Sequence, residues 1–212
     1  MLISAALVLI IAHGENASKG EVEGLELISA ENISAIYVED GSNEQLDSVL
    51  AISVKNTGDK MIDMANLTLT DRKSGEEYCF SLTHLPAGKT ARVMELDKKS
   101  APEESLDKLV LGGKVENELS LPGVRTEPGA VLKVTAAGDG VKVTNVSGAP
   151  VLEAMIFYKY YDSEENVYIG GKTGALKLST PLQPGESADI PNASMAEFSI
   201  QVLFVCVVSE VS

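Results

Sequence analysis

Tryptophan is absent from this 212-residue sequence, and aromatic residues make up only 5% of it. A hydrophobic core must therefore be built mainly from valine, isoleucine and leucine. Only two cysteines are present, Cys79 and Cys206, which is too few for a disulfide framework. Because they fall in different halves of the chain, we expect two separate thiols rather than a bridge, and cysteine usage leaves the redox compartment open.

Basic residues are also scarce: 17 lysines and arginines stand against 31 aspartates and glutamates, which gives a net charge of −14. The densest basic groups, at 71–73 and 97–99, each contain an acid. An acidic surface repels phosphate backbones and anionic lipid headgroups. The composition therefore argues against nucleic acid or a charged membrane surface as a partner, whereas the hydrophobic share of 44% is ordinary for a folded protein.

Residues that commonly carry catalysis or bind metals are few. His13 and His84 are the only histidines, and neither lies in a recognisable catalytic, nucleotide-binding or zinc-binding motif. Cys79 lies five residues before His84, but no third group that would orient such a pair is evident. We interpret His84 as a solvent-facing turn residue. The sequence predicts no catalytic, cofactor-binding or metal-binding residues and no cofactor.

One acidic loop offers a possible calcium site. Asp162, Glu164 and Asn166 alternate as oxygen ligands would, but Val167 stands where an EF-hand loop needs glycine, and Thr173 where it needs a bidentate glutamate. We therefore interpret this loop as a solvated hairpin tip, with calcium as the open alternative. The acidic stretch at 39–47 is interpreted in the same way.

Five Asn-x-Ser/Thr sequences occur, at Asn16, Asn32, Asn66, Asn145 and Asn192. In a secreted eukaryotic protein they would be glycan acceptors on the surface. The alternative is that turns and exposed strand faces use these residue types anyway, and we favour it.

The chain opens with twelve apolar or small residues, Met1 to Ala12. That length suits the apolar region of a signal peptide, about 7–15 residues, and is short of the roughly 20 that a membrane helix needs. No basic residue precedes the run, so either a late start has shortened a longer segment, or the run is a first buried strand or helix. We favour the former, because residues 13–24 are small and polar like a tether. The segment is then an uncleaved anchor or a removed signal.

After residue 21 the apolar residues alternate with polar ones, a period of two that is typical of strands. Short alternating runs separated by Gly, Pro, Asn and Asp clusters indicate a β-sandwich. The buried faces predicted in this way are Leu50, Ile52 and Val54; Ala65, Leu67 and Leu69; Val141 and Val143; and Leu152, Ala154, Ile156, Tyr158 and Tyr160.

The two halves of the chain repeat one order of strands and turns. Each has an Asn-to-Gly turn after a valine-rich strand, then an Asp turn, then a Leu-x-x-Gly turn. Because Asn and Gly tolerate positive φ, we attribute the first turn to that tolerance. The longer spacing in the second half predicts an extended hairpin around Gly170 and Gly171. The turns lie at 56–58, 71–75 and 85–89 in the first half, and at 145–148, 161–166 and 182–186 in the second.

Two segments lie outside this repeat. Residues 99–128 are rich in charge, glycine and proline, and are predicted to form a linker with a short helix capped by Ser100 and one strand from Lys108 to Leu111. The last strand, 198–208, becomes apolar on both faces and is too short to span a bilayer. We expect both of its faces to be covered, by its own sandwich or by the neighbouring one, because an exposed apolar edge invites aggregation.

Residues 139–171 contain the turn V-T-N-V-S-G, the strand I-F-Y-K and the hairpin Y-I-G-G, and residues 49–98 contain V-K-N-T-G and L-P-A-G-K. These segments resemble two successive modules of uncharacterised envelope proteins of gut Firmicutes (Clostridia). The resemblance covers most of residues 25–205, and more loosely the chain is similar to bacterial FxLYD-type Ig-like domains. Neither group has a defined activity. The resemblance implies an exported, membrane-tethered protein, although the apolar N-terminus is shorter here.

We therefore expect an all-β protein of two tandem Ig-like antiparallel β-sandwiches. The predicted divisions are a truncated signal or anchor with its tether at 1–20, a first sandwich at 21–98, a linker at 99–128 and a second sandwich at 129–212.

The expected function is non-catalytic binding or scaffolding of protein partners through sandwich surfaces, outside the cytoplasm. The protein would be secreted, or tethered to the membrane only through its N-terminal segment. The alternative is an accessory extracytoplasmic subunit of a membrane transport or secretion complex. An enzyme is the third hypothesis and the least favoured, since a fold hosts chemistry only through a site.

Overall fold

A computed structural model describes residues 22–116, 121, 123–137, 140–191 and 199–208, and the description below is confined to them. The predicted leader and tether at 1–20, together with His13, Asn16 and Asn192, lie outside the described residues. No helix in the described ranges is long and apolar enough to cross a membrane.

The described chain is almost entirely β-structure, so the all-β prediction is confirmed. The first half contains β1 (Leu25–Tyr37), β2 (Glu44–Asn56), β3 (Ile62–Asp71), β4 (Glu77–Leu85), β5 (Thr90–Met94), the 3-10 helix η1 (Glu103–Lys108) and β6 (Leu109–Glu116). The second half contains β7 (Val124–Thr126), β8 (Leu132–Ala137), β9 (Gly140–Asn145), β10 (Glu153–Asp162), β11 (Val167–Leu178), β12 (Ser187–Pro191) and β13 (Ile200–Val208).

Strand order repeats between the halves. In the first half β1-β2-β5 are neighbours in one sheet and β4-β3-β6 form another; in the second half β8-β9-β12 form one sheet and β11-β10-β13 are neighbours in another, with β7 at its edge. Counted from β1 in the first half and from β8 in the second, each set of six strands places its first, second and fifth strands in one sheet and its third, fourth and sixth in the other. The assignment of each half to an Ig-like sandwich, and the predicted domain boundaries, remain predictions.

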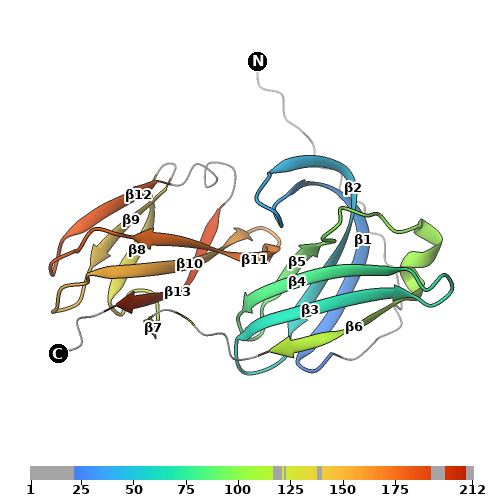
Figure 1. The fold of residues 1–212 in the computed structure, drawn as a ribbon, viewed down its shortest axis with the longest axis horizontal. Coiled ribbons are helices and arrows are strands. Elements are labelled where there is room, and N and C mark those ends of the chain that lie inside the picture. Colours follow the sequence, from blue (N-terminus) through green and yellow to red (C-terminus); the bar gives the residue numbers. More distant parts are fainter. Residues whose placement is uncertain (1–21, 117–120, 122, 138–139, 192–198, 209–212) are drawn as a thin grey trace, which may run out of the picture.

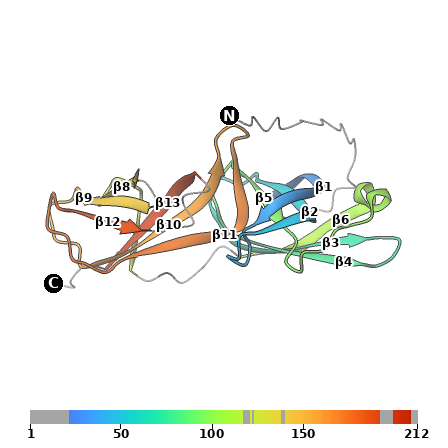
Figure 2. The same ribbon diagram turned by 90° about the horizontal axis from the view of Figure 1, so that it is seen from above.

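The two halves share one sheet. Beyond its hairpin with β10, strand β11 runs parallel to β5, where Tyr168 pairs with Ala91 and Ile169 with Arg92. This pairing joins β1-β2-β5 to β11-β10-β13-β7 in one seven-stranded sheet. The halves lie end to end along the long axis, and the β10–β11 hairpin reaches from the second half to the first (Figures 1 and 2). The halves are therefore continuous through their hydrogen bonding.

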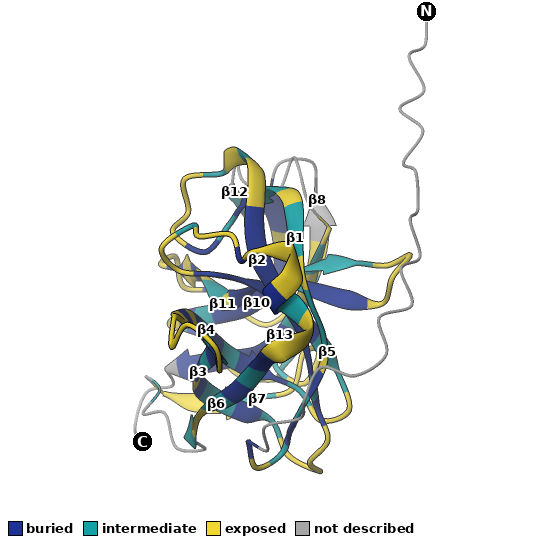
Figure 3. Cartoon of the chain, turned by 90° about the vertical axis from the view of Figure 1, so that its right-hand side faces the viewer, coloured by how far each residue is buried: buried dark blue, intermediate teal, exposed yellow. Residues whose placement is uncertain are grey.

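Alternating strands supply the cores, as predicted. The buried faces of β2 and β3 pack in one cluster, which also takes residues from the second half, and Val141, Val143, Ala154, Ile156 and Tyr158 pack in another. Buried residues follow the strands, while most connecting turns are exposed (Figure 3). The period of two therefore identified one core face of each strand correctly, but β2 and β10 are buried on their other faces as well.

Strand β13 is covered on both faces, which confirms the prediction for the last strand. Phe204 and Cys206 belong to the cluster centred on the first half, whereas Val205 and Val207 belong to the cluster of the second half. Because neighbouring residues of a strand point to opposite faces, β13 separates the two cores. Its continuous apolar run follows from having a core on each side.

The predicted Asn turns are present, but their physical cause differs from the predicted one. Neither asparagine has positive φ. Instead the Asn56 side-chain amide donates to the carbonyls of Lys60 and Leu85, both at 2.8 Å, and its oxygen accepts the Gly58 N–H at 2.9 Å. Asn145 repeats the pattern: its amide donates to the carbonyls of residues 149 and 182, at 2.8 and 2.9 Å. Each asparagine is fully buried and ties two loops together.

Residues 99–128 contain more structure than a linker with one short strand. The helix η1 begins after Pro102 without a side-chain cap, and Ser100, the predicted cap, donates instead to the Ser48 carbonyl at 3.1 Å. Strand β6 pairs with β3 along its whole length, and β7 pairs with β13. The segment therefore contributes a strand to each half.

Candidate binding site at the junction of the halves

The junction depends on two glycines inside β11. The predicted hairpin around Gly170 and Gly171 is wrong, because the turn lies at 163–166 and both glycines lie within the strand. Gly170 has a φ of +79°, and a Cβ on Gly171 would overlap the carbonyl oxygen of Ser81 in β4. The Gly-Gly pair is what lets β11 run beside β5 while passing close to β4.

Glu39 holds this strand from the side of the first half. It was predicted to lie in a solvated loop, but only 1% of it is exposed. Both of its carboxylate oxygens accept the Gly171 N–H at 2.9 Å, and one also accepts the Met94 N–H at 3.0 Å. Burial raises the pKa of Glu39, and the backbone N–H groups oppose that rise. Its neighbours from Asp40 to Ser42 are exposed, as predicted, but β2 begins at Glu44, so the solvated-loop prediction fails both for Glu39 and for the strand residues at 44–47.

Lys159 holds the same strand from the side of the second half. The side chain is 1% exposed, and its ammonium donates to the carbonyls of Gly170, Gly171 and Lys172 at 3.4, 2.5 and 3.2 Å. Three acceptors match the three N–H groups of an ammonium. Burial lowers the pKa of Lys159 from 10.5 to about 7, against the attraction of the Glu39 carboxylate.

His84 is not the solvent-facing turn residue that the sequence suggested. It lies at the end of β4 with a φ of +48° and is only 5% exposed. Its ring packs edge-on against Phe157 and Phe204, with centroid distances of 5.7 and 5.0 Å. Neither ring nitrogen has a hydrogen-bond partner among the described residues. Burial lowers the pKa of His84 to about 4, so the ring is neutral and acts as an aromatic side chain of the junction.

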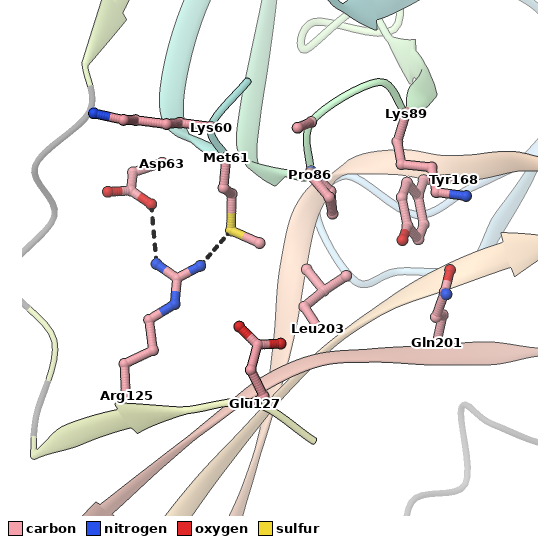
Figure 4. Close-up of a pocket in the computed structure, with 11 residues that line it drawn as sticks. Lys60, Met61, Asp63, Pro86, Lys89, Arg125, Glu127, Tyr168, Gln201 and Leu203 are labelled. Carbon is pink, nitrogen blue, oxygen red and sulfur yellow. Dashed lines mark hydrogen bonds and ion pairs between the residues drawn. The ribbon is translucent and has the colours of Figure 1, made fainter. Parts of the chain in front are cut away.

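A cleft of about 580 Å³ opens beside this junction (Figure 4). One wall is formed by the loops after β2 and β4, which Asn56 ties together, and the other by β7, β11 and β13. Arg125 reaches across it: its guanidinium contacts Asp63 Oδ1 at 3.4 Å and Met61 Sδ at 2.6 Å, and covers the Phe204 ring at 4.0 Å. The Asn56 turn, one of the two equivalent asparagine turns, therefore also shapes this cleft.

The junction cleft offers mixed polar chemistry. Its charged lining residues are Lys60, Lys89 and Arg125 against Asp63 and Glu127. In the described part of the chain, no three His, Cys, Asp or Glu side chains are grouped so that they could hold a metal ion. The arrangement suits a ligand that carries both donors and acceptors.

A second groove, of about 710 Å³, lies between the outer part of β1 and the β10–β11 hairpin. We call it the arm groove. Its lining comes from β1, β5, the hairpin and Ser199. On its rim, Arg92 forms an ion pair with Glu165 at 2.5 Å. Both this groove and the junction cleft need residues from the two halves.

The hairpin considered for calcium uses its oxygens internally. Asp162 Oδ1 accepts the N–H groups of Glu164 and Glu165 at 2.8 and 3.1 Å, and Asn166 Oδ1 accepts the Tyr161 hydroxyl at 2.5 Å. These contacts stabilise the turn, which accords with the interpretation of 162–166 as a hairpin tip.

The remaining candidate residues from the sequence are dispersed. Cys79 is exposed and Cys206 is buried, and both are free, which confirms the expectation of two separate thiols. Among the described Asn-x-Ser/Thr sites, Asn66 is exposed, Asn32 exchanges hydrogen bonds with the Ala101 backbone, and Asn145 is fully buried. Asn145 is therefore a structural residue and no glycan acceptor.

Sequence reasoning missed Glu39 and Lys159. A signal for Lys159 was present, since it stands within F-Y-K-Y-Y on the face opposite to Tyr158 and Tyr160. That face would point to solvent in an isolated sandwich, and no pattern in the neighbouring sequence indicates that a second core covers it. No family model matches this chain, and no curated protein matches it.

Proposed function

We propose that this chain is an exported cell-envelope protein that binds or scaffolds protein partners without catalysis, through the surfaces of two tandem Ig-like β-sandwiches. The observation that carries the proposal is the buried junction: β11 is shared by both halves and is held by Glu39 on one side and Lys159 on the other. Such a junction fixes the relative position of the halves, so that surfaces built from both keep one shape. Preformed surfaces lower the entropic cost of binding.

The sequence supports the location. Its apolar first residues and the small polar residues that follow suit a protein displayed outside a cell. The repeated strand order supports tandem Ig-like units, because each half divides its six strands between two sheets in the same way.

Fractionation of the native host with an antibody tests the location, with expected recovery in the membrane or extracellular fraction. Recovery in the cytosol would overturn the proposal. A photo-crosslinking residue at Gln201 in the junction cleft, and another at Ser163 in the arm groove, test binding in the same cells. Adducts of defined mass are expected from at least one of these sites and not from exposed Lys73 in the β3–β4 turn.

A further inference from the structure

The lining of the arm groove combines apolar side chains with polar and charged ones. Its aliphatic and aromatic residues are Ile33, Ala35, Ile36, Met94, Tyr161 and Ile169. Residues 33–36 line it consecutively. Because successive side chains of a strand point to opposite faces, a consecutive run along a groove indicates that the edge of the strand, with its backbone groups, faces the groove.

Strand β1 has such an edge to offer. It is the outermost strand of the seven-stranded sheet, and among the described strands it pairs with β2 alone. Beyond that pairing, residues 33–36 make no backbone hydrogen bond to any other described residue. An unpaired edge beside an apolar groove is the arrangement that accepts an extended peptide as an added strand.

Both walls of the groove are held in place by hydrogen bonds and an ion pair. At the end of β1, the Tyr37 hydroxyl donates to the carbonyls of Glu95 and Leu96, both at 3.0 Å. On the opposite wall, Arg92 pairs with Glu165, and the Glu39 carboxylate holds β11. A peptide would therefore meet a preformed site, which favours binding because little ordering is needed.

Charge decides the kind of peptide. The groove is lined by three carboxylates, Asp162, Glu164 and Glu165, and by one cation, Arg92, which is already paired with Glu165. Asp162 is occupied with its turn, whereas Glu164 is exposed. The junction cleft is different, with three cations in its lining. Complementarity to the arm groove therefore requires aliphatic side chains flanked by positive charge.

We propose that the arm groove binds an extended segment of a partner protein in which aliphatic residues alternate with lysine or arginine, and that this segment pairs with the edge of β1 at 33–36. The inference rests on the proposed binding function and specifies the partner for one surface. One face of the added strand would place its aliphatic side chains on the groove floor, and the other would bring its cations to the acidic rim.

The test uses the full chain and two acetylated peptides, one alternating lysine with isoleucine and one alternating glutamate with isoleucine. Titration calorimetry should show the basic peptide binding at least about tenfold more tightly, with affinity that falls as salt rises. Equal affinity for both peptides, or binding of neither, would overturn the proposal.

Variants place the site. Glu164→Lys should lower the affinity for the basic peptide by about tenfold. Glu77→Lys makes the same change in net charge at the start of β4 and should leave that affinity nearly unchanged. Equal effects of the two variants would show a general charge effect and contradict the site. If the arm groove does not bind the peptide, crosslinking at Gln201 and recovery in the membrane or extracellular fraction are still expected. If the protein is recovered in the cytosol but still binds the basic peptide, only the proposed function is overturned.

Discussion

Glu39 and Lys159 bring opposite charges to one buried stretch of β11, and replacing them singly and together tests whether each stabilises the other. Lys159→Met removes the donor to three carbonyls and takes away the positive charge that favours the buried Glu39 carboxylate, which keeps only its backbone hydrogen bonds. Glu39→Gln leaves the ammonium uncompensated in the same way. At about pH 6, where Lys159 is protonated, removal of one member of a buried pair of opposite charges costs about 3–5 kcal/mol, so each single variant should lose that much free energy of unfolding at that pH.

The double variant has neither of these two buried charges. It loses hydrogen bonds worth about 1 kcal/mol each, so we expect a total cost of about 3–4 kcal/mol, at least about 2 kcal/mol less than the sum of the singles. The matched control is Lys114 with Glu116, an ion pair at 2.8 Å whose side chains are 78% and 42% exposed. Lys114→Met and Glu116→Gln should couple by less than about 0.5 kcal/mol.

The pH dependence carries a second signature of Lys159. Its pKa falls from 10.5 when exposed to about 7 when buried, so between these values the unfolded chain holds a proton that the folded chain has released. Stability contributed through this group therefore rises as pH increases across that window, by at most about 1.4 kcal/mol per pH unit. Between about pH 7 and about pH 9 the wild type should gain roughly 2 kcal/mol relative to Lys159→Met.

Equilibrium unfolding in urea, followed by circular dichroism, measures all of these free energies on the full chain. Additive single-variant losses, within about 0.5 kcal/mol, would refute the reasoning that the two charges compensate each other. A wild-type advantage over Lys159→Met that shrinks as pH rises would refute the direction of the pKa shift.

Three further predictions concern the backbone and the thiols. Gly171→Ala should lower stability by about 3 kcal/mol or more in urea unfolding, because its Cβ would overlap the Ser81 carbonyl, while Gly148→Ala, with open space around it, should change it by less than about 1 kcal/mol. Asn56→Ala should cost about 2–4 kcal/mol through its unsatisfied loop carbonyls, and Asn66→Ala, at an exposed position, should be nearly neutral; equal melting temperatures would contradict this. A thiol reagent should label the exposed Cys79 in the folded protein and the buried Cys206 only after unfolding. Labelling of both thiols at the same rate in the folded protein would count against the described packing.

Local patterns predicted much of the fold. The alternation in β3 and β9 identified their core faces, because burial on one face of a strand leaves a period of two in the sequence. In β2 the alternation identified one core face and missed the other, which is buried as well. The apolar run of β13 correctly indicated cover on both sides. The position of the turn at Asn56 was also predicted, although its cause was not, since side-chain hydrogen bonds to distant loops leave no local trace.

The junction could not be predicted from the same patterns. Glu39 and Gly171 are hydrogen-bonded across 132 positions, and an acid in a polar stretch or a lysine in a strand normally marks solvent. His84 was misplaced for the same reason: its neighbours in the sequence indicate a turn, while the rings that cover it come from β10 and β13. Burial against the other half decides the role of each of these residues.

The hairpin that enters the first half gives the pair of repeats a polarity. Its counterpart in the first half is the β3–β4 hairpin, where Thr68 occupies the position that Lys159 has in β10, three residues before the turn aspartate, and β4 contains no glycine. The second half thus contributes the hairpin, and the first half contributes the site that accepts it. The halves are alike in strand order and yet not interchangeable, since a copy of the first half in place of the second would bring neither the buried lysine nor the Gly-Gly pair to the junction.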